Sequence, residues 1–80
     1  MNLQDMIELE ELRRDAVRLR SSARRLAAKW LEAERRFARS PSAALSSDAR
    51  AAYDKWMQTL CASIEARFRL QKFRRKGKTK

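Results

Sequence analysis

The stretch LEELRRDAVRLRSSARRLAAKWLEAERRF, residues 9–37, repeats apolar residues at alternating intervals of three and four positions. The repeating residues are Leu9, Leu12, Ala16, Leu19, Ala23, Leu26, Trp30, Ala33 and Phe37. This heptad spacing aligns the apolar side chains along one stripe of an α-helix, and such a stripe needs another helix to cover it. The stretch therefore predicts an all-α fold.

Helix-ending residues outside this stretch divide the chain into two long helices. We predict a first helix over about residues 3–39 and a loop over residues 40–46, because Pro41 disfavours helical geometry at the preceding Ser40. A second helix over about residues 47–75 follows, with Ser46 or Ser47 as its N-cap. Residues 1–75 then form one antiparallel helical hairpin, and residues 76–80 form a basic flexible tail.

The second helix has an apolar stripe of its own, formed by Ala49, Tyr53, Trp56, Met57, Leu60, Ile64 and Phe68. Folding the two stripes together pairs Trp30 with Trp56 and Leu26 with Leu60. The main seam residues are then Leu9, Leu12, Leu19, Leu26, Trp30, Phe37, Tyr53, Trp56, Leu60, Ile64 and Phe68. A dimer that exchanges the same contacts between two chains fits this pattern equally well.

The apolar content of the chain is too small for a stable isolated hairpin. Thirteen of the apolar residues are alanine, which buries little area. Further apolar residues such as Met6, Val17 and Leu31 lie off the seam and broaden the buried face. We therefore expect a homodimer, in the form of a four-helix bundle or coiled coil.

The composition is typical of a cytoplasmic protein. The single cysteine, Cys61, cannot form an internal disulfide, and acidic residues stand where a secretory signal would carry lysines. Apolar runs are too short to cross a bilayer, so we expect no integral membrane association.

The net charge of +10 is concentrated in two segments that point to an anionic partner. Residues 13–40 carry +7 and residues 67–80 carry +8. Arginine, which binds phosphate or carboxylate through two parallel hydrogen bonds, outnumbers lysine. The candidate binding residues are Arg13, Arg14, Arg18, Arg20, Arg24, Arg25, Arg67, Arg69, Lys72, Phe73, Arg74, Arg75 and Lys76, with Phe73 as a base-stacking or wedge residue.

Catalysis and cofactor binding are not expected. The chain has no histidine, its one cysteine has no histidine base, and Gly77 is its only glycine, which excludes a glycine-rich phosphate loop. Its carboxylates are dispersed over helix surfaces, so we expect no metal site and no cofactor.

In size and hairpin plan the chain is similar to the short RNA-binding helical hairpins of plasmid copy control, which dimerise into four-helix bundles. The similarity extends to the run of Cys61, Arg67 and Phe68. Through its Pro41–Ser42 loop it also resembles type III secretion needle subunits and their small helical chaperones. No residue role is carried over from either family, and the arginine content departs from the second.

Two functional hypotheses follow from these features. The first is a small basic regulator that binds nucleic acid through phosphate contacts without base-specific readout. The second is a protein-interaction module, such as an inhibitor, adaptor or chaperone encoded by a mobile element, which docks its arginine-rich face on an acidic protein surface.

Overall fold

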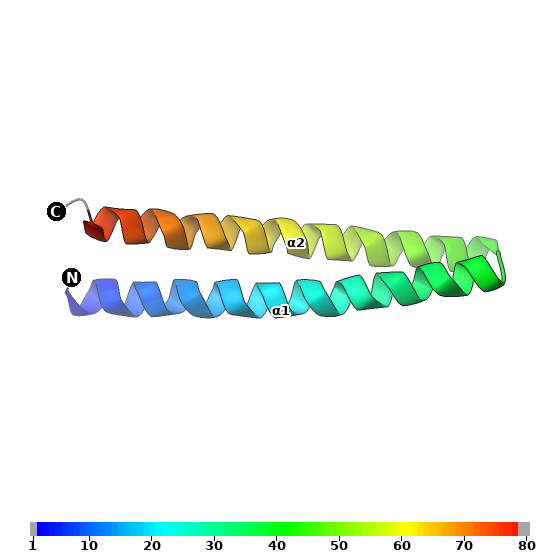
Figure 1. The fold of residues 1–80 in the computed structure, drawn as a ribbon, viewed down its shortest axis with the longest axis horizontal. Coiled ribbons are helices and arrows are strands. Elements are labelled where there is room, and N and C mark those ends of the chain that lie inside the picture. The colour runs from blue at the N-terminus through cyan, green and yellow to red at the C-terminus, as the bar shows by residue number, and fades with distance from the viewer. Residues whose placement is uncertain (1, 79–80) are drawn as a thin grey trace.

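The computed structural model describes residues 2–78, which form two long α-helices. Helix α1 spans Leu3–Arg39 and helix α2 spans Ala43–Lys78. The helices lie side by side in opposite directions, and both ends of the chain lie at the same end of the rod (Figure 1). The rod measures 59 × 16 × 13 Å between Cα atoms. The predicted all-α antiparallel hairpin is confirmed.

The turn between the helices is shorter than the predicted loop. Only Ser40, Pro41 and Ser42 lie outside the two helices at this point. The Ser42 Oγ accepts a hydrogen bond of 3.1 Å from the backbone N–H of Leu45, which makes Ser42 the N-cap of α2. The prediction of a start at residue 47 was wrong because Ala43, Ala44 and Leu45 are strong helix formers that extend the helix back to this cap.

The other end of α2 also extends further than predicted. The helix continues to Lys78 instead of ending at residue 75, so residues 76–78 of the predicted flexible tail are helical. Residues 79–80 of that tail lie outside the described residues. At the start of α1, the Oδ1 of Asn2 accepts a hydrogen bond of 2.8 Å from the backbone N–H of Asp5 and caps the helix.

The seam of α1 follows the heptad of the sequence. Ala23 is buried, and the larger seam residues are half-buried: Leu9, Leu12, Leu19, Leu26, Trp30 and Phe37. Between these positions, the residues on the outer faces of α1 are exposed. The side chains that α1 turns towards α2 are thus mainly bulky ones.

The seam of α2 differs from the predicted stripe. The buried and half-buried residues at alternating intervals of three and four are Leu45, Ala49, Ala52, Trp56, Thr59, Ser63, Ala66, Leu70 and Phe73. Three residues of the predicted stripe are more exposed than this seam: Ile64 and Phe68 are 45 and 65% exposed, and Tyr53 is 40% exposed although its ring contacts Trp30 of α1. The small seam residues of α2 leave room for the bulky seam of α1.

Three aromatic rings form the largest contact between the helices. The rings of Trp30 and Trp56 stack with centroids 5.1 Å apart and planes 5° apart, as the predicted pairing required. The ring of Tyr53 stands edge-on to both, at 5.4 Å from Trp30 and 5.7 Å from Trp56. The Nε1 of Trp30 donates a hydrogen bond of 3.2 Å to Glu34. These contacts hold both helices in one register in the half of the rod nearer the turn.

The buried core consists of three small side chains. Ala23, Ala49 and Ala66 are the buried hydrophobic residues of the described chain, and no large side chain within it is fully buried. Within residues 2–78, neither helix contains a segment apolar enough to cross a bilayer. The hairpin is therefore held together by half-buried side chains along its whole length.

Candidate anion-binding site

Each helix has residues on either side of its seam. Surface depressions show which of these residues from the two helices share one side of the hairpin. One depression of about 180 Å³ is lined by Arg20 of α1 and Arg67 of α2. A second, nearer the turn, is lined by Glu34 of α1 and Tyr53 of α2. Because antiparallel packing brings equivalent heptad positions together, these residues share one side, which we call the cluster side. On the opposite side, Asp48 lines a depression with basic residues of α1.

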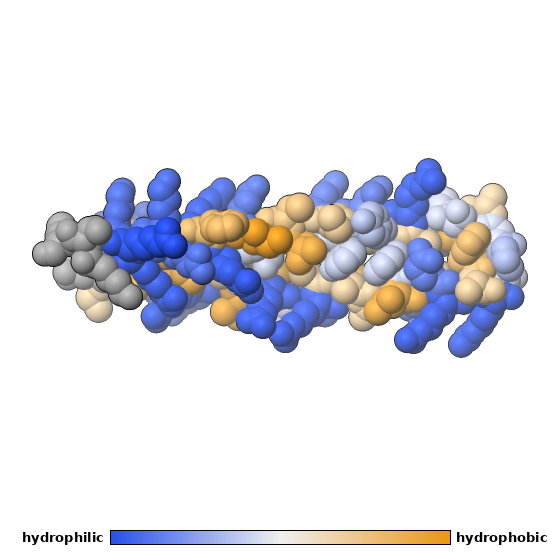
Figure 2. Space-filling model, turned by 45° about the horizontal axis from the view of Figure 1, so that its top comes forward, coloured by the Kyte–Doolittle hydropathy of each residue, from blue (hydrophilic) through white to orange (hydrophobic). Residues whose placement is uncertain are grey.

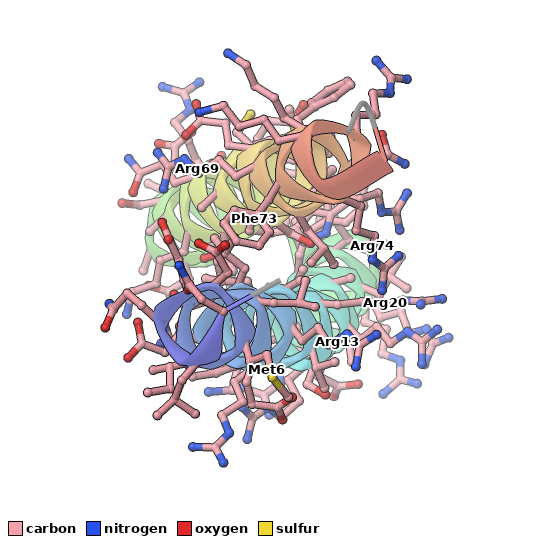
Figure 3. The ribbon with its side chains drawn as sticks, turned by 90° about the vertical axis from the view of Figure 1, so that its left-hand side faces the viewer. Met6, Arg13, Arg20, Arg69, Phe73 and Arg74 are labelled. Carbon is pink, nitrogen blue, oxygen red and sulfur yellow. The ribbon has the colours of Figure 1, made fainter. Side chains whose placement is uncertain are left out.

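Four arginines gather on the cluster side, in the half of the rod that holds the chain ends. Arg13 and Arg20 come from α1, and Arg67 and Arg74 come from α2. Viewed along the rod, Arg13, Arg20 and Arg74 all project to the same side of the hairpin (Figure 3). We call these four residues the arginine cluster. Two guanidinium groups per helix thus face one region of solvent.

The arginine cluster has no carboxylate partner within residues 2–78. All four side chains are exposed, and none of them forms an ion pair with a described residue. Between Arg20 and Arg67, the depression has a floor of the seam residues Ala16, Ser63 and Leu70. Four positive charges held close together without neutralisation attract anions.

Within residues 2–78, four arginines elsewhere on the rod are matched by acidic residues of their own helix. The ion pairs are Arg14–Glu10 at 3.8 Å, Arg18–Asp15 at 3.6 Å, Arg36–Glu32 at 3.6 Å and Arg69–Glu65 at 3.9 Å. Each pair is exposed on both sides and contributes at most about 1 kcal/mol to stability. The partners nevertheless lower the local charge, so these arginines are weaker anion sites than the arginine cluster.

Among the remaining candidate residues, the structure places Arg69 away from the cluster. Arg69 lies on the opposite side of the hairpin from Arg74 (Figure 3). Arg24, Lys72, Arg75 and Lys76 are exposed, and Arg25 donates a hydrogen bond of 3.3 Å to the Oγ of Ser22. Sequence reasoning therefore identified the arginines but not their division into two sides.

Phe73 is not placed for the predicted role in base stacking. Its side chain is half-buried in the seam and lies between the two helices (Figure 3). The prediction failed because it treated Leu70 and Phe73 as pointing away from the apolar stripe, whereas both belong to the α2 seam. The alternating intervals that continue from Ala66 through Leu70 to Phe73 were the signal that could have revealed this.

No known protein family, curated protein sequence or solved structure matches the chain. The site must therefore be interpreted from its own chemistry. Among residues 2–78, no group of three or more metal-binding side chains comes together. What the cluster side offers is positive charge from Arg13, Arg20, Arg67 and Arg74 beside exposed hydrophobic residues.

Proposed function

We propose that this protein is a small basic helical regulator that binds nucleic acid through phosphate contacts, without base-specific readout. The observation that carries the proposal is the arginine cluster, with its four exposed and unpaired guanidinium groups. Guanidinium groups bind phosphate oxygens through paired, charge-assisted hydrogen bonds. A polyanion with regularly spaced phosphates is the ligand that suits such a cluster.

The spacing of the cluster supports contacts to a duplex. Arg13 and Arg20 are one heptad apart, as are Arg67 and Arg74, so each pair is separated by about 10 Å along its helix. Packed helices lie about 8–10 Å apart, so the four Cα atoms outline a square of similar size. The major groove of a duplex is about 12 Å wide, so arginines at this spacing can reach phosphates on both of its edges.

The width of the hairpin argues against base-specific recognition. The paired helices measure 16 Å across their Cα atoms. A major groove of about 12 Å accommodates one helix but not two lying side by side. We therefore propose that the hairpin lies across the phosphates and contacts the nucleic-acid backbone alone.

We further propose that the protein acts as a homodimer in the cytoplasm and that it is not an enzyme. The three buried alanines support self-association, because they provide little apolar burial for an 80-residue chain. Cys61 is an exposed free thiol, which is typical of a reducing compartment. The absence of histidine from the sequence supports a binding role, since histidine is the commonest general base.

Two double variants of α2 test the proposal, because they remove the same charge from opposite sides. The variant Arg67→Gln with Arg74→Gln removes half of the arginine cluster, whereas the control Arg69→Gln with Lys72→Gln leaves it intact. Binding to a labelled DNA duplex is measured by fluorescence anisotropy between about 50 and 300 mM salt. We expect the cluster variant to flatten the log–log salt dependence by about two units, or about 0.9 per lost phosphate contact, and the control by less than half of that.

Other outcomes of this experiment would contradict the proposal. Equal losses in the two variants would mean that net charge alone, without the cluster, drives binding. No binding at the lowest salt concentration would exclude a nucleic-acid ligand. A salt-sensitive complex with one protein that survives nuclease treatment would instead favour the interaction module that docks on an acidic protein surface.

A further inference from the structure

An uncovered apolar patch lies on the cluster side, nearer the turn than most of the arginine cluster. Leu31, Tyr53 and Ile64 are exposed to 49, 40 and 45%, and they adjoin Ala27, Met57 and Leu60, which are half-buried. We call these six residues the apolar patch. A band of hydrophobic side chains is visible along the middle of α2, with hydrophilic side chains at its margins (Figure 2). Exposed apolar area of this extent marks an interaction surface.

The opposite side of the hairpin carries no comparable patch. The positions that flank the seam there are Glu8, Asp15, Ser22, Lys29, Arg36, Asp48, Lys55, Ala62, Arg69 and Lys76. None of these is a large hydrophobic residue. The hairpin is therefore two-sided, and one side alone is suited to packing against another protein surface.

We infer that the apolar patch is covered by a second copy of this chain, in an antiparallel arrangement whose two-fold axis passes near Ala27. The turn halves of the two hairpins overlap in this dimer, and the ends that carry Arg13 and Arg74 project from it. The inference rests on the proposed self-association. It places Arg20 within the overlap, so Arg13 and Arg74, nearer the ends of the rod, are the cluster residues that remain open to an anion.

Charge selects the antiparallel arrangement. A parallel dimer would place the arginine cluster of one copy against that of the other, with strong repulsion between eight guanidinium groups. A two-fold axis near Ala27 instead brings Arg20 of one copy opposite Glu34 of the other, because Arg20 lies seven residues before Ala27 and Glu34 lies seven residues after it. Glu34 lines the depression beside Tyr53, so its carboxylate lies on the side that the second copy covers.

The area available is sufficient for a dimer. Residues 15–39 of α1 extend equally on both sides of Ala27 and span about 36 Å of helix. With the 16 Å width of the hairpin, this overlap covers roughly 600 Å² per copy. The total of about 1,200 Å² lies at the lower limit for specific stable complexes, so we expect an equilibrium that depends on protein concentration.

Mass measurement with surface variants tests the interface. We expect the natural chain to sediment as a dimer at high micromolar concentration, and Leu31→Glu with Ile64→Glu to sediment as a monomer. The control Ala51→Glu with Gln58→Glu adds the same charge at exposed positions away from the patch and should remain dimeric. Circular dichroism of each variant confirms that the helices are retained. A dimeric patch variant, or a monomeric natural chain, would overturn the inference.

Disulfide crosslinking tests the direction of the two copies. In a Cys61→Ser background, Ala27→Cys places the new thiols near the axis, whereas Val17→Cys places them about 30 Å apart. We expect oxidation to link the first variant into a dimer and leave the second unlinked. Efficient linkage of the Val17 variant would overturn the antiparallel geometry while leaving self-association intact. Neither result depends on nucleic-acid binding, which the DNA titration addresses separately.

Discussion

At the scale of single residues, the approach of the two helices depends on small side chains. Ala23, Ala49 and Ala66 are each about 95% buried, and they come from both helices. Their methyl groups let the backbones approach closely enough for the neighbouring bulky residues to interdigitate. Any enlargement at these positions must push the helices apart.

A comparison of two alanines on α2 checks this close approach. We expect Ala66→Leu to lower the free energy of unfolding by about 1–3 kcal/mol, because the added atoms overfill a packed seam. Ala51→Leu, at an exposed position of the same helix, should change it by less than about 0.5 kcal/mol. Urea titration followed by circular dichroism gives both values. Equal effects of the two substitutions would show that Ala66 does not lie at a tight contact.

The seam of α1 could be predicted residue by residue, whereas that of α2 could not. In α1, bulky apolar residues occupy the seam, so hydrophobicity alone finds it. In α2, bulky residues such as Tyr53 and Ile64 lie beside the seam, and small or polar residues such as Ala66, Ser63 and Thr59 lie within it. A search for the most hydrophobic stripe selects the wrong face when packing demands small residues and another face is left for a partner.

At the scale of helices, serine side chains decide where α2 begins. Ser42, Ser46 and Ser47 are all suitable caps by residue type, but only Ser42 follows directly from Pro41. Its Oγ accepts the Leu45 N–H, and its carbonyl oxygen accepts a bond of 3.0 Å from the Ser46 N–H. The predicted loop was too long because the earliest capping serine available after the proline takes this role.

Two serine substitutions distinguish the observed cap from the predicted one. Ser42→Ala should lower the free energy of unfolding by about 1 kcal/mol, because the N–H that its Oγ accepts loses its partner. Ser47→Ala, within α2, should be neutral or stabilise by a few tenths of a kcal/mol, since alanine favours a helix. Thermal melts of the two variants provide the comparison. A larger loss for Ser47→Ala would indicate that the helix begins later.

At the scale of the whole molecule, we expect self-repulsion to outweigh the ion pairs of the described residues. The net charge of +10 is spread along a rod only 59 Å long. The four exposed ion pairs contribute at most about 1 kcal/mol each, and the remaining basic groups repel one another. Screening of these charges by salt should therefore stabilise the folded state, because it reduces the repulsion more than it weakens the ion pairs.

Salt should accordingly stabilise this protein. Raising sodium chloride from about 10 to 300 mM shortens the Debye length from about 30 Å to below 10 Å, which removes most of the long-range repulsion. We expect the melting temperature, followed by circular dichroism at constant protein concentration, to rise by several degrees. A melting temperature that falls with salt would mean that the ion pairs dominate the electrostatics.

More of the architecture than of the candidate site could be predicted from the sequence. Helix periodicity and the single proline were sufficient for the hairpin, because both depend on local sequence. Whether Arg67 and Arg74 lie beside Arg13 and Arg20 depends on which face of α2 packs against α1. That face is set by the contact between the two helices. An error of one position in that face moves Arg67 or Arg74 towards a different side, so the cluster could be located only in three dimensions.

The aromatic contacts lie nearer the turn, so the local stability of the hairpin should fall from the turn towards the free ends. Trp30, Tyr53 and Trp56 join the helices close to the turn, where bringing them together costs the least chain entropy. We therefore expect folding to proceed from the turn outwards, with the contacts of the free ends forming last. Amide protons there exchange most readily with solvent, as expected for the part of lowest local stability. We therefore expect the two helix ends that carry Arg13 and Arg74 to be the part of the hairpin that adjusts to the spacing of the anions they meet.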